Sequence, residues 1–484
     1  MNYGQFLNMV PEFYLVLILI AVFAVDFIMH KSEKKHDVLS AVTMALMAVL
    51  PFRIAFLSEP SEAFAGLYVA SEAVNVMKVI LAFGTLIVLI MAQPWLKTAR
   101  RLEGEFYMLV ISTLLGMFVM MSSGNFLLFF LGLEMASVPM ACMVAFDKWK
   151  QNSAEGAAKY ILVATFSSGV MLFGISFIYA ATGTLYFDDV AAVITAKPLT
   201  IMGLAFFFSG LGFKISLVPF HFWTADTYQG APTPVTGYLS VISKGAAAIT
   251  LCTILMKAFA PMVEYWDYML YVVIVLSITV ANLFAIRQSE LKRFMAFSSI
   301  SQAGYIMLAV VGNSQLGIAS LTYYVLVYIV ANMAVFTVIS AVENANVQHP
   351  NPTFNVQRSM FNVYDGLYQT NPKLAFLMTL ALFSLAGIPP FAGMFSKFFV
   401  FMAGVQNGQP LAYFVVFVAL VNTVVSLYYY LLIVKCMYIT KTDSPLPTFK
   451  SDCYTRTALA ICTAGIALFG VVSCIYEWIA AAGM

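Results

Sequence analysis

The chain has 484 residues, of which 62% are hydrophobic and only 10% are charged. About a quarter of the residues of an ordinary soluble domain are charged, so this composition excludes a soluble globular protein. The net charge of +2 gives no reason to expect a nucleic-acid partner. The six cysteines form no CxxC pair that would indicate a disulfide framework, an iron–sulfur cluster or another metal site.

Apolar segments of roughly 20 residues recur from end to end, and each is long enough to cross a hydrocarbon core of about 30 Å. We therefore predict an all-α polytopic membrane protein with about fourteen transmembrane helices. The first segment follows Glu12 and lacks a basic flank, which favours a retained helix over a cleaved signal peptide. The predicted spans are 11–29, 38–57, 74–95, 106–122, 125–146, 154–181, 199–222, 229–257, 267–287, 294–312, 317–343, 372–404, 411–440 and 455–482.

Basic residues are concentrated in every second loop. Four lie in even-numbered loops or at span edges, namely Arg53, Lys78, Lys197 and Lys257. Short cytoplasmic loops are enriched in Lys and Arg, so the odd-numbered loops are predicted to be cytoplasmic and both termini to lie on the opposite side. The odd-numbered loops contain sixteen basic residues: Lys31, Lys34, Lys35, Lys97, Arg100, Arg101, Lys148, Lys150, Arg287, Lys292, Arg293, Arg358, Lys373, Lys441, Lys450 and Arg456.

The remaining five basic residues lie within predicted spans. Lys435 is close to a cytoplasmic end, where its side chain can reach water, and Lys159 is near the start of its span, where either a surface or a buried role is open. Lys214, Lys244 and Lys397 are deep in their spans. Each costs about 2.5–3.5 kcal/mol on insertion scales, so these three are predicted to face the interior of the helix bundle.

One acidic residue, Glu134 in "FLGLEMASVP", lies in the middle of the fifth predicted span. Buried alone, Glu134 and Lys214 would each become neutral, whereas together they can hold one another charged. Such a pair is either a protonatable switch or a static ion pair that fixes helix packing. Buried lysines in further helices favour the switch.

Two predicted spans combine a buried lysine with helix breakers. In the seventh, Pro219 follows Lys214 and removes a backbone donor. In the twelfth, the glycines and prolines of "LAGIPPFAGMFSK" precede Lys397. Broken helices at matching positions of inverted repeats indicate a transport site near the membrane centre.

The two broken spans are five apart, and a repeat of five spans must be inverted because five is odd. We predict two inverted five-helix repeats, each with one broken helix. The division is a three-helix segment at 1–100, a first repeat at 101–260, a second repeat at 261–441 and a last helix at 442–484.

His221 lies just after the break in "PFHFW". It is either a hydrogen-bonded capping residue or a proton shuttle, since the unperturbed histidine pKa lies near 6.5. No second His or Cys accompanies it, so a zinc site is not predicted.

The stretch "GLGFKISLVPFHFWTADTYQGAPTPVTGYLSVISK" (210–244) resembles the antiporter-like, proton-translocating membrane subunits of respiratory complex I. The segments "FFLGLEMASVP", "ELKRFMAFSSISQAGY" and "SLAGIPPFAGMFSKFFVF" match this family at the expected places, so the resemblance covers roughly residues 100 to 440. In three details the chain resembles the subunit N branch of this family. These are the loop sequence W-T-x-D-x-Y-Q-G-A-P, Lys397 where M-type subunits have glutamate, and a chain that stops after its fourteenth span.

The resemblance implies a hydrated proton path from Glu134 and Lys214 through Lys244 to Lys397, with His221 and Lys159 as further candidates. It also implies that the energy comes from NADH-to-quinone electron transfer. NADH, FMN, iron–sulfur clusters and quinone would be bound elsewhere in the complex, and this chain would hold no redox centre. The implied partners are neighbouring antiporter-like and small membrane subunits and the peripheral redox arm, in a bacterial inner membrane with both termini periplasmic.

The sequence departs from the family at two positions. Ala225 stands where the family usually has proline, which leaves the predicted loop more flexible but removes no proton carrier. Gln302 stands where relatives can have histidine, so this position is not predicted to carry protons. Two other classes remain open: a subunit of a multisubunit sodium/proton antiporter, and a purely structural subunit of a membrane arm.

Overall fold

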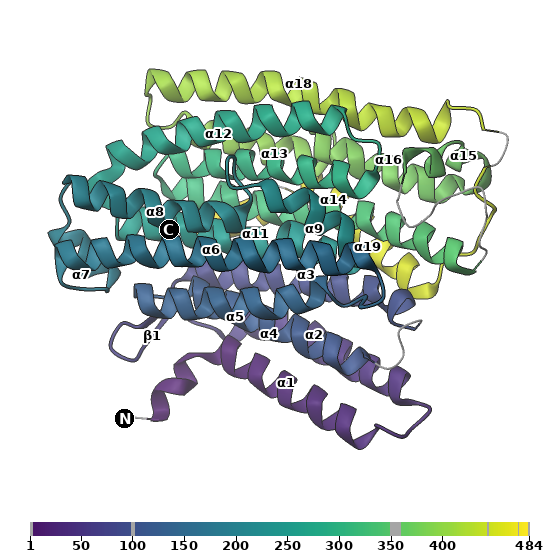
Figure 1. Cartoon of the computed structure of the whole chain (residues 1–484), viewed down its shortest axis with the longest axis horizontal. Coiled ribbons are helices and arrows are strands. Elements are labelled where there is room, and N and C mark those ends of the chain that lie inside the picture. The colour runs from purple at the N-terminus through teal and green to yellow at the C-terminus, as the bar shows by residue number, and fades with distance from the viewer. Residues whose placement is uncertain (1–2, 98–101, 349–359, 443–444, 473, 483–484) are drawn as a thin grey trace.

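The computed structural model of the chain describes residues 3–97, 102–348, 360–442, 445–472 and 474–482. Three basic residues of the predicted cytoplasmic loops, Arg100, Arg101 and Arg358, lie outside the described residues. The described part is almost entirely helical, and its longer helices lie side by side along one direction (Figure 1).

The first part of the chain contains η1 (Tyr3–Asn8), α1 (Val10–Ile28), α2 (Lys35–Leu57), β1 (Ser61–Ala63), β2 (Tyr68–Ala70), α3 (Glu72–Leu96), α4 (Glu103–Met121), α5 (Phe126–Val144), α6 (Gln151–Thr182) and α7 (Phe187–Val193). The middle part contains α8 (Pro198–Ile215), α9 (Phe222–Gly230), α10 (Thr233–Tyr238), the π-helical turn η2 (Leu239–Ser243), α11 (Lys244–Lys257), η3 (Ala260–Met262), α12 (Val263–Ile286) and α13 (Leu291–Val311). The last part contains α14 (Gln315–Gln348), η4 (Phe361–Tyr364), α15 (Leu367–Thr370), α16 (Pro372–Ala386), α17 (Ala392–Gly404), α18 (Pro410–Tyr438), α19 (Cys453–Val471) and α20 (Cys474–Ala482).

The predicted number of spans agrees with these helices. Within the described ranges, 13 helices are long and apolar enough to cross a membrane. The two shorter apolar helices α16 and α17 together cover the remaining predicted span, 372–404. The predicted all-α membrane fold is therefore confirmed.

Burial separates the central helices from the peripheral ones. The apolar segments of α13 and α14 are wholly buried by other helices, and α10, η2 and α11 together are nearly so. In contrast, only 28–33% of the apolar segments of α1, α6 and α18 is buried by other helices, as expected of helices that face lipid. In Figure 1, α18 runs along one edge of the bundle and α1 along the opposite edge. The centre of the molecule thus consists of α11, α13 and α14.

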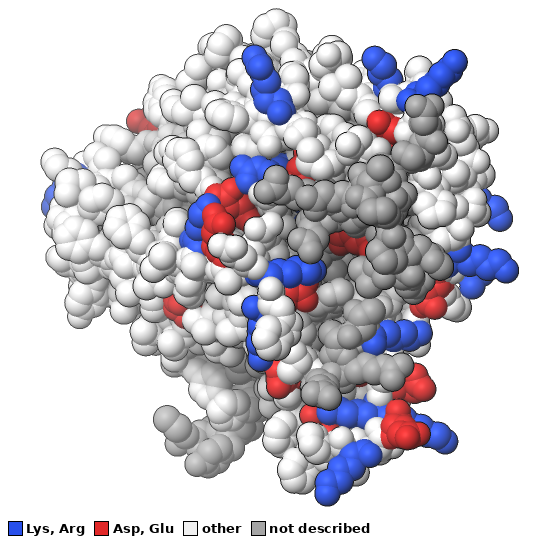
Figure 2. Space-filling model, turned by 45° about the vertical axis from the view of Figure 1, so that its right-hand side comes forward, with Lys and Arg blue, Asp and Glu red and all other residues white. Residues whose placement is uncertain are grey.

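Charged side chains gather at one end of the bundle. Figure 2 shows lysine, arginine and acidic residues over the end that lies on the right in Figure 1, whereas much of the lateral surface has none. Both chain termini lie toward the opposite end in Figure 1. The predicted orientation assumes such a concentration of charged residues at one end of the bundle.

The seventh predicted span is broken between α8 and α9. Helix α8 ends at Ile215, and Ser216 has a left-handed backbone with φ of 67°. Proline at position 219 cannot continue a helix, because its ring would clash with the carbonyl of residue 215. The chain becomes helical again at Phe222.

Interpreting the residues after this break as a loop is wrong, because Phe222–Gly230 form α9. The indole of Trp223 anchors this helix: its N–H donates to the carbonyl of Phe213 over 3.2 Å. The Trp223 ring also lies 5.1 Å from the rings of Phe213 and Tyr160. These packing partners come from α8 and α6, and local sequence does not reveal them.

The twelfth predicted span is broken between α16 and α17. Helix α16 ends at Ala386 and is followed by Gly387 with φ of 89°, a conformation that glycine adopts without steric cost. Lys214 lies in the last turn of α8 and Lys397 in the second turn of α17. One lysine therefore precedes its break and the other follows it, as predicted.

A short β-hairpin, β1 and β2, connects α2 and α3 and was not predicted. Its antiparallel register pairs Ser61 with Ala70, and its turn contains Gly66 with φ of 82°. Tyr68 of this hairpin is fully buried.

Candidate functional site

Lys214 is 3% exposed and lies between α5, α6 and α8. Its Nζ donates to the Ser137 hydroxyl over 2.8 Å and to the Tyr160 hydroxyl over 3.2 Å. Hydroxyl groups both donate and accept hydrogen bonds. Both hydrogen-bond partners of the amine are thus neutral hydroxyls that can stabilise it in either protonation state.

Glu134 is half-buried on α5, and its Oε1 accepts from the Ser168 hydroxyl over 2.5 Å. No ion pair shorter than 4.0 Å joins it to Lys214 in the described part of the chain. Instead Lys214 binds Ser137, which lies about one helical turn after Glu134 on the same helix. The two predicted partners are therefore neighbours, but they are not in direct contact.

Lys244 is 1% exposed and is the first residue of α11, directly after the π-helical turn η2. Such turns often occur at functional sites. Its Nζ donates to the Ser299 hydroxyl of α13 over 2.7 Å and lies 5.6 Å from the centre of the Tyr228 ring. Tyr228 also approaches Ser299, with 3.4 Å between the two hydroxyl oxygens. Like Lys214, this lysine binds hydroxyls and no carboxylate among the described residues.

Lys397 is 4% exposed. Its Nζ donates over 2.9 Å to the carbonyl of Ala386, the last residue of α16, where the negative end of the helix dipole favours a cation. The amine also lies 5.0 Å from the centre of the Tyr305 ring. The broken helix thus supplies the acceptor of this lysine.

A small cavity lies beside Lys397. It offers about 10 Å³ to the centre of a water molecule and is lined by Lys397, Gln302, Tyr324 and Tyr328 among others. This is close to the space that one water needs, and such a water requires polar partners. Gln302 and Lys397 therefore line the same cavity, which has room for about one water molecule.

Gln302 was not predicted to carry protons, but the structure places it in a buried hydrogen-bond network that the sequence did not reveal. Its amide nitrogen donates to the Tyr430 hydroxyl over 3.3 Å, and its amide oxygen accepts from the Tyr324 hydroxyl. Tyr430 in turn shares a hydrogen bond of 2.5 Å with Ser298, the neighbour of Ser299. The available signal was the polar run "SSISQ" inside an otherwise apolar span.

The surroundings of Lys214 and Lys244 are linked by aromatic rings. Tyr160 lies 5.1 Å from Trp223, and Trp223 lies 6.4 Å from Tyr228, measured between ring centres. Among the described residues, no direct side-chain hydrogen bond crosses this gap. From Lys214 to Lys397 the order is thus a hydroxyl-bound lysine, an aromatic gap, a second hydroxyl-bound lysine, a tyrosine–glutamine network and a third lysine.

His221 is the N-cap residue of α9 and makes no side-chain capping hydrogen bond. The hydrogen-bonded capping role is therefore wrong. Its ring stacks on Phe222 with 4.7 Å between centres, and Nδ1 has no hydrogen-bond partner in the described structure. A free ring nitrogen is what a proton shuttle requires.

Lys159 lies apart from the buried row. Its side chain is 43% exposed and forms ion pairs of 2.6 Å with Glu155 and with Asp226. Asp226 also pairs with Arg293 over 2.5 Å. Lys159 therefore belongs to a partly exposed charge cluster near the charged end of the bundle, and the surface role left open by the sequence is the one observed.

Lys78 corrects the count of buried lysines. The sequence placed it at a span edge, but its side chain is 0% exposed and pairs with Glu12 over 2.7 Å. Tyr68 donates to the other oxygen of the same carboxylate over 2.9 Å. Burial raises the pKa of Tyr68, so its hydroxyl keeps the proton that it donates. The hairpin buries Lys78, and the hydropathy of the sequence could not predict this burial.

The family of the chain follows from comparison with known proteins. Residues 123–424 match the family model described as "NADH:quinone oxidoreductase/Mrp antiporter, TM", a range that contains Glu134 and the three deep lysines. The chain belongs to this family of antiporter-like transmembrane subunits.

Its relatives specify the branch. A Phocaeicola vulgatus protein named "NADH-quinone oxidoreductase subunit N" is 54% identical over 483 residues, covering 99% of this chain and 98% of that protein. A protein of the same name from Azobacteroides pseudotrichonymphae is 47% identical over 489 residues, covering 99% and 98%.

Solved structures share the fold. A chain of respiratory complex I from Thermus thermophilus superposes with a TM-score of 0.81 at 27% identity, covering 98% of this chain and 100% of that one. A chain of the Mrp complex from a Dietzia species gives the same TM-score of 0.81 at 18% identity, covering 100% and 97%. At that identity the second match shows the fold alone.

Proposed function

We propose that this chain is the proton-translocating membrane subunit N of NADH-quinone oxidoreductase, respiratory complex I. In this proposal, protons move through the buried groups Glu134, Lys214, Lys244 and Lys397, and electron transfer from NADH to quinone elsewhere in the complex drives them. The observation that carries the proposal is that all three lysines are at most 4% exposed and bind neutral oxygens.

Neutral partners matter because they do not fix the charge of the amine. A lysine in a tight ion pair is held protonated by its carboxylate. A lysine bound to a hydroxyl or a carbonyl can release a proton and keep an uncharged contact, since hydroxyls act as donor or acceptor. The amines at positions 214 and 244 are therefore suited to alternate between two protonation states.

The switch in this proposal is the distance between Glu134 and Lys214. A shift of α5 that brings the carboxylate to the amine would stabilise the ammonium, and a shift away would favour release. Glu134 is half-buried and its carboxylate binds only Ser168 among the described side chains, so few hydrogen bonds hold the carboxylate in its present position. Water would carry protons across the aromatic gap, with His221 as a further carrier.

The energy has to come from outside the chain. Moving one proton against 100 mV costs about 2.3 kcal/mol. In this proposal NADH, FMN, iron–sulfur clusters and quinone are bound by other subunits, whose electron transfer supplies that energy. Proposed partners are neighbouring antiporter-like and small membrane subunits and the peripheral redox arm.

The orientation and repeats are also part of the proposal. The basic end of the bundle is placed in the cytoplasm of a bacterial cell and both termini in the periplasm. The repeats are 101–260 and 261–441, each with one broken helix, between the segment 1–100 and the last helix at 442–484.

The test is NADH-driven, quinone-dependent proton uptake by inverted membrane vesicles that contain the assembled complex. Replacing Lys244→Ala should lower the rate at least about tenfold, equivalent to 1.4 kcal/mol or more. Lys435→Ala, at an exposed lysine of α18, is the matched control and should pump normally. Undiminished pumping by an assembled Lys244→Ala complex would support the structural-subunit alternative.

The antiporter alternative rests on the family description, which covers Mrp antiporters as well as NADH:quinone oxidoreductases. It predicts proton movement driven by a sodium gradient in vesicles without NADH. Our proposal predicts that such vesicles show no sodium-driven exchange and that NADH starts the proton uptake.

A further inference from the structure

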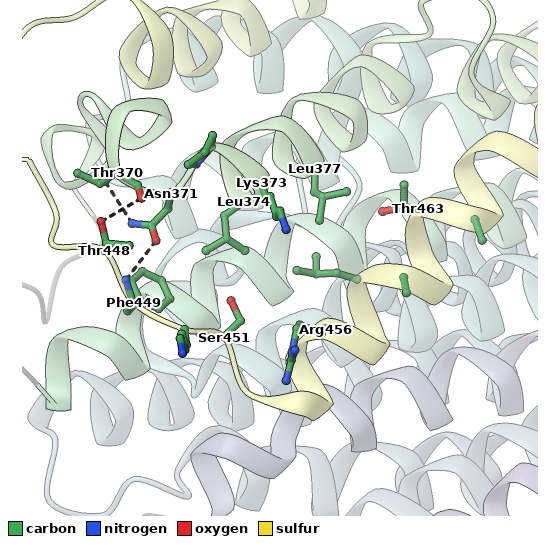
Figure 3. A pocket seen from close by; sticks show the side chains of 15 residues that line it. Thr370, Asn371, Lys373, Leu374, Leu377, Thr448, Phe449, Ser451, Arg456 and Thr463 are labelled. Atoms are coloured by element: carbon green, nitrogen blue, oxygen red, sulfur yellow. Dashed lines mark hydrogen bonds between the residues drawn. The ribbon is translucent and has the colours of Figure 1, made fainter.

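A groove of about 860 Å³ opens between α16, α19 and the segment that leads into α19. We call it the basic groove. Figure 3 shows Lys373 of α16 and Arg456 of α19 on opposite walls, with Leu374 and Leu377 beside them. Its lining residues are Thr370, Asn371, Pro372, Lys373, Leu374, Leu377, Thr448, Phe449, Lys450, Ser451, Arg456, Leu459, Ala460, Thr463 and Ala464.

Three positive charges surround the groove. Lys373, Lys450 and Arg456 are exposed, and none of them forms an ion pair with an acidic residue of the described structure. The nearby Asp452 does not line the groove. Unpaired basic side chains on two walls of one cavity favour an anionic occupant.

Hydrogen bonds fix the shape of the polar end. The Asn371 side chain accepts from the backbone N–H of Phe449 over 3.3 Å and donates to the carbonyl of Pro447 over 3.3 Å. The Thr448 hydroxyl donates to the carbonyl of Thr370 over 3.2 Å. These bonds, drawn in part in Figure 3, hold the segment before α19 against the start of α16, so the polar end of the groove is preformed.

The rest of the groove is mainly apolar, with Thr463 as a polar residue among its lining side chains. Leu377, Ala460 and Ala464 lie one to three turns inside α16 and α19, and α19 is long and apolar enough to span a membrane. The groove therefore begins with basic residues at the charged end of the bundle and continues along apolar side chains toward the membrane interior. Its volume lies within the range of about 300–1,000 Å³ typical of ligand pockets.

We infer that the basic groove binds an anionic phospholipid, with its phosphate among Lys373, Lys450 and Arg456 and an acyl chain along Leu377, Ala460 and Ala464. Basic pockets between membrane helices attract such headgroups, and each basic residue raises the affinity about fivefold. The apolar wall explains why the occupant is a lipid and not a free phosphate. This inference does not depend on the proposed proton path.

The experiment uses the intact complex in lipid nanodiscs. Two photoactivatable lipids with the same diazirine-bearing acyl chains are compared, phosphatidylglycerol and phosphatidylcholine. After irradiation, the label on peptides of α16 and α19 is measured by mass spectrometry. We expect phosphatidylglycerol to label these peptides at least about tenfold more than phosphatidylcholine.

Two variants separate the polar and apolar parts of the groove. The triple variant Lys373→Gln, Lys450→Gln and Arg456→Gln should lose at least about tenfold of the phosphatidylglycerol label. Ala464→Phe keeps all three charges and fills the apolar part, so it should lose label as well. The matched control removes three exposed lysines away from the groove, Lys31→Gln, Lys34→Gln and Lys148→Gln, and should keep its label.

Several outcomes would overturn the inference. Equal labelling by the two lipids would mean that charge does not select the occupant, and unchanged labelling of the triple variant would mean the same. Loss of label on adding inorganic phosphate, with no effect of Ala464→Phe, would assign the groove to a free phosphate. A cross-link from a photoactivatable amino acid at position 460 to another subunit, with no lipid adduct, would assign it to a protein partner. Native gels confirm that each variant complex assembles before labelling.

Discussion

Gln302 lines the small cavity beside Lys397 and donates to Tyr430, which bonds to Ser298. Replacing Gln302→Leu therefore tests whether this buried network contributes to proton movement. Leucine has a similar size but removes the donor to Tyr430 and to the Leu385 carbonyl and the acceptor from Tyr324. It also makes one wall of the small cavity beside Lys397 apolar. Each lost hydrogen bond between neutral groups contributes about 1 kcal/mol.

The two bonds to the tyrosines together correspond to about 2 kcal/mol, or roughly a thirtyfold lower rate if both have to be intact when a proton passes. The assay is NADH-driven proton uptake per assembled complex in inverted vesicles. Gln302→His is the conservative comparison, because imidazole keeps one donor and one acceptor. We expect it to retain most of the pumping rate that Gln302→Leu loses.

The reasoning would be refuted if Gln302→Leu assembled normally and pumped at the rate of the unmodified complex. It would also be refuted if histidine and leucine lowered the rate equally, because that result would indicate a requirement for the shape of glutamine and not for its hydrogen bonds.

Two further predictions concern buried contacts away from the central network. Lys78→Met leaves the Glu12 carboxylate buried without its cation and should destabilise the chain by about 3–5 kcal/mol. The measurement is the amount of assembled complex that remains after mild heating, and adding Glu12→Gln should restore part of the loss. Gly387→Ala imposes about 1–2 kcal/mol of left-handed backbone strain and places a Cβ 3.0 Å from Cδ of Lys397, so pumping should fall. Gly183→Ala shares the positive φ but meets no atom within 4 Å, and normal pumping is expected there; equal losses in the two variants would attribute the effect to the backbone alone.

Residue order alone was enough to predict the span count, the two helix breaks and the three deeply buried lysines. These features are local: a span needs a run of apolar residues, a proline removes a donor from its own helix, and a charge far from either end of a span cannot reach water. The side of the break on which Lys214 and Lys397 lie was equally readable, because it depends only on residue order. The motif around Lys214 also indicated the family to which the chain belongs.

The contacts of these lysines could be known only from the packing of the helices. It gave Lys214 a serine and a tyrosine where the sequence suggested Glu134, and it joined Gln302 to two tyrosines from distant helices. It also showed that Lys78 is buried under a hairpin. Hydrogen-bond partners in a bundle depend on how each helix is rotated and shifted against its neighbours. Helices that are apolar on all sides carry little sequence signal for that rotation, so the partners emerge only when the helices are packed together.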